Sequence, residues 1–332
     1  YELTVSKVDR IKPVISVVAV PDEWATSSTV TLTATDEGGS GLTAYAVTST
    51  NVAPATGWQS DNSFTLTANG TFYAWAKDGA GNVSAGYSFT VTKIDTTKPV
   101  IDAVSIPAVW GASNTVTISA SDTGSGLTSY ALTKTGAAPS TGWQTGSSFT
   151  VTVNGTYYAW TKDNAGNVSA AYIFEVGKVD AVKPIISEII TPEEWTRAAG
   201  ITVVATDAET GIAGYALTKS NTEPTSGWQD GKNFEIMANG TYYAWVKDGA
   251  GNTTYKSFYF TKIDSVAPGI SSVAVSTGWG VSNSVTITAT DTGSGVAAYA
   301  VTSSDTAPVD GWQDTKSLTL SGNGTWYAWA KD

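Results

Sequence analysis

The 332-residue sequence contains no cysteine and no histidine. Disulfide bonds, thiol nucleophiles and cysteine-ligated metals are therefore excluded, and the commonest general base and zinc ligand is missing too. Basic residues are few, because 18 Lys and Arg stand against 29 Asp and Glu, which gives a formal net charge of −11. This charge repels phosphate backbones and anionic lipid surfaces, so the composition argues against nucleic-acid and membrane-surface binding.

Long apolar runs and helical periodicity are also lacking. No apolar run reaches the ~18 residues needed to span a bilayer, which predicts no membrane insertion. Short segments rich in Val, Thr, Ile and Tyr instead alternate apolar and polar residues with a period of two. Loops rich in Gly, Asp and Pro separate these segments. The chain is therefore predicted to be all-β.

What the sequence does contain is one motif in four copies. The stretch Asn154–Asn167 recurs at Asn69–Asn82 and Asn239–Asn252, and its first part recurs at Asn323–Asp332. The Trp at its centre is Trp75, Trp160, Trp245 or Trp329, so the spacings are 85, 85 and 84 residues. A fixed period of this size corresponds to one small domain.

A proline recurs once per period and marks the predicted domain boundaries. The predicted division is 1–9 (the last strand of a preceding repeat), 10–95, 96–180, 181–264 and 265–332, the last lacking its final strand. In the first full repeat we predict strands at 14–20, 29–35, 42–48, 63–67, 71–77 and 83–92. Six or seven antiparallel strands in a unit of this length favour a two-sheet sandwich over a small barrel.

Several motifs carry a family resemblance over the whole chain: Asp122–Leu127, Gly155–Tyr158, Lys162–Ser169 and the linker Lys93–Pro99. The sequence resembles the bacterial immunoglobulin-like repeats of secreted and cell-surface proteins. This resemblance implies four tandem immunoglobulin-like β-sandwich domains in a linear array, located outside the cell, that act as spacers or adhesive modules. No enzyme activity is expected, because the recurring acidic residues lie on turns and no repeat differs from its neighbours by a plausible active site.

The resemblance also implies that three loops meet at one end of each sandwich, where acidic residues would converge. Carboxylate and amide oxygens gathered in this way are the ligands of Ca²⁺, and no other cofactor is expected. Turn chemistry alone is one alternative, and neutralisation by Lys77, Lys162, Lys247 and Lys331 is another. The candidate ligands are Asp9, Asp36, Asp78 and Asn82; Asp95, Asp122, Asp163 and Asn167; Asp180, Asp207, Asp248 and Asn252; and Asp264, Asp291 and Asp332.

Aromatic residues raise a second functional reading, a carbohydrate- or ligand-binding adhesin module. Alternation over 71–77 places Phe72 and two alanines on one face and Tyr73, Trp75 and Lys77 on the other, without deciding which face is the core. An outer aromatic stripe would bind a sugar ring unless the loop 57–59 covers it, and inert packing is favoured. The candidate residues are Tyr73, Trp75, Tyr158, Trp160, Tyr243 and Trp245, with the series Trp24, Trp110, Trp195 and Trp279 as a further option.

Asn-Gly-Thr begins every copy of the motif and has two interpretations. It matches the glycosylation sequon, and Asn-Gly is also a strong tight-turn dipeptide. We favour the turn, because Asn69, Asn154, Asn239 and Asn323 all recur just before the strand that carries the central Trp.

The leading hypothesis from the sequence is a non-catalytic stalk segment of a bacterial surface protein or fibre. Its expected partners are the neighbouring repeats and identical chains joined head to tail, because residues 1–7 match the strand that the fourth copy lacks. The alternative, which we favour, is that both ends merely reflect a fragment boundary.

Overall fold

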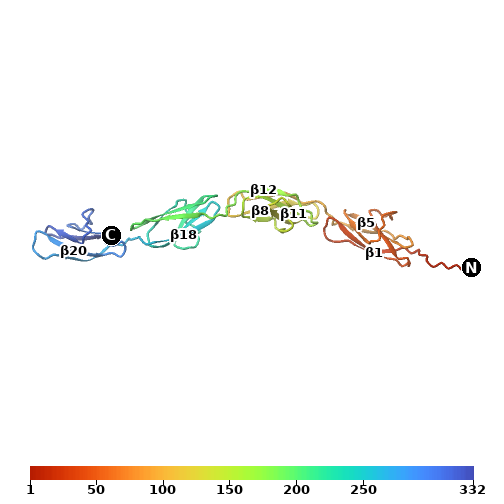
Figure 1. Ribbon diagram of the computed structural model, residues 1–332, viewed down its shortest axis with the longest axis horizontal. Coiled ribbons are helices and arrows are strands. Elements are labelled where there is room, and N and C mark those ends of the chain that lie inside the picture. Colours follow the sequence, from red (N-terminus) through yellow and green to blue (C-terminus); the bar gives the residue numbers. More distant parts are fainter. The chain divides into compact units, whose positions relative to one another are not determined.

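The computed structural model describes all 332 residues, and every regular element in it is a β-strand (Figure 1). The structure contains no helix able to cross a membrane. Strand β2 (Ser28–Thr35) shows how the sequence pattern works: Val30 and Leu32 are buried, while Thr29 and Thr31 between them are exposed. The β-branched threonines suit the exposed face of a pleated sheet. The all-β prediction is confirmed.

Each of the first three repeats consists of two three-stranded antiparallel sheets. In the first repeat the strand orders are β1-β2-β4 and β3-β5-β6, which correspond to strands A-B-E and C-F-G of an immunoglobulin-like sandwich. Between the sheets lies a core that includes Leu32 from one side and Ala74 and Ala76 from the other. The second and third repeats repeat this order, and the fourth has A-B-E and a two-stranded C-F sheet.

The strand bounds follow the repeat. The first repeat has β1 (Val14–Ala19), β2 (Ser28–Thr35), β3 (Leu42–Thr48), β4 (Ser63–Leu66), β5 (Gly70–Asp78) and β6 (Tyr87–Val91). The second has β7 (Val100–Ser105), β8 (Asn114–Ser121), β9 (Leu127–Thr133), β10 (Ser148–Val151), β11 (Gly155–Asp163) and β12 (Tyr172–Val176). The third has β13 (Ile185–Ile190), β14 (Ala199–Thr206), β15 (Ile212–Thr218), β16 (Asn233–Ile236), β17 (Gly240–Asp248) and β18 (Thr253–Phe260). The fourth has β19 (Gly269–Val275), β20 (Asn283–Thr290), β21 (Ala298–Thr302), β22 (Ser317–Leu320) and β23 (Tyr327–Lys331).

The chain groups into two compact units. Unit 1 comprises Tyr1–Val109 and Ser113–Val179, and unit 2 comprises Trp110–Ala112 and Asp180–Asp332. Unit 1 therefore holds nearly all of the first two repeats, and unit 2 holds the last two. The finer division into four domains, with boundaries near 95, 180 and 264, stays a prediction.

Five of the six strands predicted for the first repeat agree with the structure to within one residue at each end, and the sixth begins later than predicted. Residues 84–86 form a bulge: Val83 pairs with Lys77 and Tyr87 with Ala74, so three residues oppose two. The hydroxyl of Ser84 accepts a hydrogen bond from the Ala76 backbone N–H. The third repeat lacks this extra residue, so β18 pairs with β17 without interruption, which explains the shorter spacing between the last two central tryptophans.

The corner before strand F carries a further mark of the immunoglobulin-like fold. The hydroxyls of Tyr157 and Tyr242 each donate to the carbonyl four residues upstream, at 2.7 Å, which is the tyrosine corner. Phe72 occupies this position in the first repeat and has no hydroxyl. In the fourth repeat the indole N–H of Trp326 donates to the Gly322 carbonyl instead. Together with the strand order, this corner identifies the repeats as immunoglobulin-like sandwiches.

We expect Tyr157→Phe to lower the local unfolding free energy of the second repeat by about 0.5–1.5 kcal/mol, because the Val153 carbonyl loses its donor. Hydrogen exchange of strand β11 in the full chain measures this change. Tyr158→Phe is the matched control, because Tyr158 points to the opposite face of the same strand. Equal effects of the two substitutions would show that the corner hydrogen bond does not stabilise the repeat.

Candidate metal centre

Three aspartates converge at one end of every repeat. One lies in the linker that enters the repeat, one follows the second strand, and one ends strand F or its equivalent. In each group the three carboxylates contribute oxygens that all lie within 4.8 Å of one another. The groups are Asp9, Asp36 and Asp78; Asp95, Asp122 and Asp163; Asp180, Asp207 and Asp248; and Asp264, Asp291 and Asp332. The structure therefore brings together the aspartates that the sequence analysis grouped.

In the last three repeats the aspartate after the second strand uses only one of its two oxygens in the loop, whereas both oxygens of Asp36 accept loop N–H groups, from Gly38 and Gly41. In the second repeat, Asp122 Oδ2 accepts hydrogen bonds from the N–H groups of Gly124 at 3.1 Å and Gly126 at 2.7 Å. Its other oxygen, Oδ1, is buried and has no hydrogen-bond partner. In the fourth repeat Asp291 Oδ2 is buried and unpartnered in the same way. A buried carboxylate oxygen without a donor is costly, so these two atoms are candidate ligand atoms for a cation.

The aspartate that ends strand F is held by the asparagine four residues later. Asp163 is 1% exposed, and its two oxygens accept the backbone N–H and the side-chain Nδ2 of Asn167, both at 2.7 Å. Nδ2 of Asn167 also donates to the Asp95 carbonyl at 3.0 Å. Asn82 and Asn252 make the equivalent contacts. The three asparagines therefore lie at the clusters as hydrogen-bond donors, with the amide nitrogen rather than the predicted oxygen facing the carboxylate.

The linker aspartate is bonded to the loop of the repeat that follows it. Asp95 Oδ2 accepts the Ser125 N–H at 2.6 Å, and Asp264 Oδ2 accepts the Ser294 N–H at 2.6 Å. These backbone donors are the main reason that the pKa of both carboxyl groups lies below the ordinary value of 3.8. The pKa of Asp9 is lowered chiefly by the Ser40 hydroxyl. These carboxylates are therefore ionised at neutral pH.

The backbone of the same linker is bonded to the preceding repeat. Asp95 N–H donates to the Ala25 carbonyl at 2.9 Å, and Ile94 exchanges two hydrogen bonds with the side-chain amide of Asn69, at 2.7 and 2.8 Å. The equivalent contacts in unit 2 are from Asp264 to Thr196 and between Ile263 and Asn239. The asparagine of Asn-Gly-Thr therefore holds the linker, and both its amide nitrogen and its amide oxygen are used in hydrogen bonds.

The recurrent lysines do not neutralise the clusters, contrary to one of the alternatives drawn from the sequence. Each ammonium lies over the ring of the tryptophan in the Gly-Trp-Gln loop, for example Lys77 at 4.1 Å from the Trp58 centroid. The other three pairs have distances of 4.3, 4.7 and 4.8 Å. The one salt bridge in the structure joins Lys93 to Asp22, outside the clusters. Alternation explains the outcome, because the lysine precedes the aspartate on strand F and so points to the opposite face.

A glycine in the loop allows the linker carboxylate to approach. A Cβ on Gly124 would lie 2.3 Å from Asp95 Oδ2, and Gly38 and Gly293 are equally crowded by Asp9 and Asp264. The third repeat has Glu209 at this position, and there Asp180 accepts the Thr210 hydroxyl at 2.7 Å instead of a backbone N–H. This requirement was not predicted from the sequence. The signal was present, because glycine lies two residues after the loop aspartate in three repeats and Glu209 lies there in the third.

The candidate aromatic ligand residues are mostly covered. Ala74 and Ala76 lie in the core, so Tyr73 and Trp75 face outward, yet Trp75, Trp160 and Trp245 are each only 5% exposed. The indole of Trp75 donates to the Thr48 hydroxyl at 2.8 Å, and Gln59 in the Gly-Trp-Gln loop pairs with Tyr45 on the neighbouring strand. These tryptophan rings therefore cannot stack on a sugar in this conformation. In the other series, Trp110, Trp195 and Trp279 are exposed.

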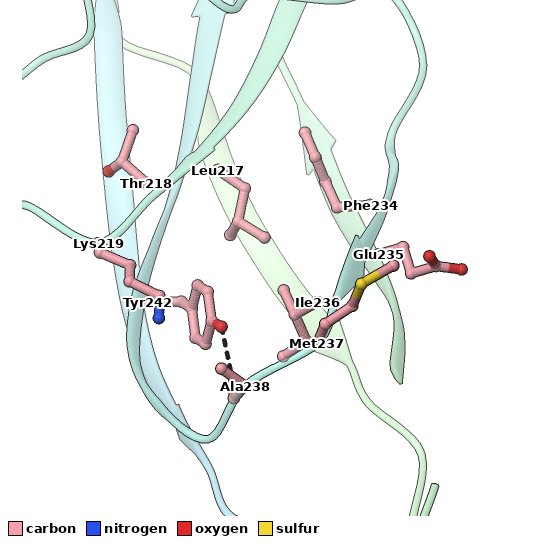
Figure 2. Close-up of a pocket in the computed structure, with 9 residues that line it drawn as sticks. All are labelled: Leu217, Thr218, Lys219, Phe234, Glu235, Ile236, Met237, Ala238 and Tyr242. Atoms are coloured by element: carbon pink, nitrogen blue, oxygen red, sulfur yellow. Dashed lines mark hydrogen bonds between the residues drawn. The ribbon is translucent and has the colours of Figure 1, made fainter. Parts of the chain in front are cut away.

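The third repeat also has an open groove between β15 and β16, with a volume of about 410 Å³. Figure 2 shows Leu217, Phe234 and Ile236 around it, with the Tyr242 hydroxyl bonded to Ala238. Two of these residues, Ile236 and Tyr242, belong to the core of the repeat. The groove is therefore the open side of the sandwich, where its two sheets part.

Comparisons with known proteins were made by sequence and by structure. No protein-family model matches the sequence, and no curated protein matches it significantly. Among similar solved structures are the FN1–FN3 domains of chicken CNTN1 (12% identity, 75% of this chain and 99% of that chain, TM-score 0.26). Another is domains A168–A170 of titin, with 9% identity over 77% of this chain and 100% of that chain and a TM-score of 0.31. A third is a tetra-tandem repeat from the extending region of a large adhesion protein, with 17% identity over 92% of this chain and 89% of that chain and a TM-score of 0.22. The fold assignment rests on the strand order and the tyrosine corner.

We expect Gly124→Ala to destabilise the contact between the linker and the second repeat by about 1 kcal/mol, because the new Cβ displaces the Asp95 carboxylate from the Ser125 N–H. Chemical denaturation of the full chain and hydrogen exchange at Ser125 measure the loss. Gly146→Ala is the control, since its Cβ would meet no atom closer than 3.7 Å. If Gly124→Ala behaved like the control, close approach of the carboxylate would not be what the glycine serves.

Proposed function

We propose that this chain is a non-catalytic spacer in a bacterial extracellular protein or fibre, and that its repeats provide reach and stiffness. The observation that carries the proposal is that the linker is hydrogen-bonded to the repeat on each side of it. Asp95 donates through its backbone to one repeat and accepts through its side chain from the next, at 2.9 and 2.6 Å. Asp264 does the same in unit 2. A linker with this many fixed bonds resists bending, whereas a Gly/Ser linker behaves as a flexible coil.

We also propose that Ca²⁺ binds at the aspartate clusters and stiffens the linkers. Three carboxylates lie together without a lysine or arginine to balance them. At 4.8 Å, two like charges repel by roughly 1 kcal/mol in water and by about 3 to 4 kcal/mol at an effective dielectric constant of 20. The unpartnered oxygens of Asp122 and Asp291 supply ligands that no protein donor uses. Ca²⁺ takes six to eight oxygen ligands, so waters and carbonyls would complete its coordination.

We expect small-angle scattering from the full chain to give an extended particle. Repeats of about seven-residue strands with loops are roughly 30 to 40 Å long, so four in line would span on the order of 120 to 160 Å. Asp95→Ala combined with Asp264→Ala should broaden the distribution of interatomic distances, because both linkers lose their side-chain bond to the next repeat. Asp102→Ala, on strand β7, is the control. A compact particle for the unaltered chain would rule out the spacer function.

We expect Ca²⁺ to raise the melting temperature and a chelator to reverse the effect. An ion at 100 times its dissociation constant stabilises the folded form by about 2.7 kcal/mol. Asp122→Asn should reduce the shift, because it removes one carboxylate charge from the site that holds the buried oxygen. Asp102→Asn, which leaves the cluster intact, should retain it. A melting temperature indifferent to millimolar Ca²⁺ would contradict the calcium site while leaving the spacer function standing.

A further inference from the structure

The third repeat carries an aromatic surface that the other repeats do not have. On strand β18, Tyr255 and Tyr259 are 47% and 70% exposed. Phe258 and Phe260 belong to the core, so alternation turns the two tyrosines to the outer face of the sheet. Tyr255 packs on two residues of β17, with its ring centroid 5.8 Å from that of Tyr243 and 4.7 Å from that of Trp245.

The loss of one residue creates this surface. In the first two repeats the bulge precedes strand G, and the regular pairing ends at Tyr87 with Ala74 and at Tyr172 with Ala159, before the central tryptophan is reached. A side chain at Gly86 would collide with Trp75, since its Cβ would lie 2.9 Å from the ring. Without the bulge, β18 runs straight and places Tyr255 opposite Trp245. The position of Tyr259 is taken by Thr90 in the first repeat and by Glu175 in the second.

The chemistry of this surface suits an uncharged, ring-containing ligand. Ser257 separates the two exposed tyrosines, and Thr241 lies opposite Tyr259. No carboxylate faces outward from β17 or β18, and Lys247 is held over the Trp228 ring. The hydroxyls of Tyr157 and Tyr242 are bonded to carbonyls, whereas Tyr255 and Tyr259 keep theirs free for a ligand. The chain's net charge of −11 disfavours anionic polymers.

The dimensions also favour a linear ligand over a protein. Four residues along a strand separate Tyr255 from Tyr259 by about 13 Å, so one monosaccharide cannot contact both rings. The exposed parts of the two tyrosines together present roughly 230 Å². A stable protein interface takes about 800 Å² from each partner, which this stripe does not supply.

We propose that the outer face of β17 and β18 binds a neutral polysaccharide, with Tyr255 and Tyr259 stacking on sugar rings and their hydroxyls bonding to sugar hydroxyls. Tyr243 and Trp245 support Tyr255 from beneath. The recurrent tryptophan thus contributes as a platform for the exposed tyrosine and does not itself touch the sugar. This inference is independent of the spacer function, because it concerns one face of one repeat.

Native electrophoresis of the full chain in gels containing hydroxyethylcellulose, xylan or soluble starch tests the proposal, with alginate as the anionic comparison. We expect at least one neutral polymer to retard the chain and alginate to have no effect. Tyr255→Ala and Tyr259→Ala should each weaken retardation about five- to tenfold, and the double variant should abolish it. Tyr172→Ala is the control. Tyr172 is 36% exposed, but alternation along β12 places it on the same inward face as Phe174 and Val176.

Tyr259→Ala is the more informative single variant, because most of its ring lies in solvent and its removal leaves the packing on Trp245 intact. Circular dichroism confirms that each variant is folded. The proposal is wrong if none of the three neutral polymers retards the chain, or if the double variant is retarded as strongly as the unaltered chain. It is also wrong if light scattering shows a dimer that the double variant abolishes, since the stripe would then be a protein interface.

Discussion

The linker aspartate is the constraint on which the rest of each junction depends. The backbone N–H of Asp95, for example, donates to the Ala25 carbonyl of one repeat, while its carboxylate accepts the Ser125 N–H in the loop of the next repeat. Where the carboxylate accepts a loop N–H, as at Asp95 and Asp264, the residue two positions after the loop aspartate is glycine, because a Cβ there would collide with the carboxylate. The linker aspartate also places the asparagine after strand F, whose Nδ2 reaches the linker carbonyl. One residue therefore constrains the side chains of two distant segments.

Two faces of strand F carry two different tasks, and the size of their side chains explains the division. Alanines on the inner face allow the two thin sheets to approach, and the larger Leu32 and its neighbours fill the space between them. The outer face has no second sheet, and there the Trp75 indole donates to the Thr48 hydroxyl on β3 while Lys77 lies over the ring of Trp58 in the Gly-Trp-Gln loop. The lysine is thereby kept away from the aspartates. Because this lysine packs on the outer face of strand F, it does not balance the negative charge of the aspartates at the end of that strand.

Alternation and turn residues were enough to predict five strands of the first repeat, whereas the convergence of the aspartates was predicted from the resemblance to immunoglobulin-like repeats. These patterns could not decide which face of strand F is buried, because Ala74 and Trp75 are both apolar. The orientation of the Asn167 amide was also beyond them, since the linker carbonyl that fixes it is 72 residues away. The bulge at Ser84 escaped because its signal is a single extra residue, visible only by comparison with the third repeat.

The third repeat differs from the other repeats at two places outside its core. Its junction departs from the others through Glu209 and Thr210, and its strand G departs through the missing bulge residue. The core of the repeat and its tyrosine corner are nevertheless retained. Because the changes fall on a loop and on an outer sheet face, they alter the surface without a cost to the packing between the sheets. The proposed polysaccharide-binding face is therefore compatible with the proposed spacer function, because it involves only the outer surface of one repeat.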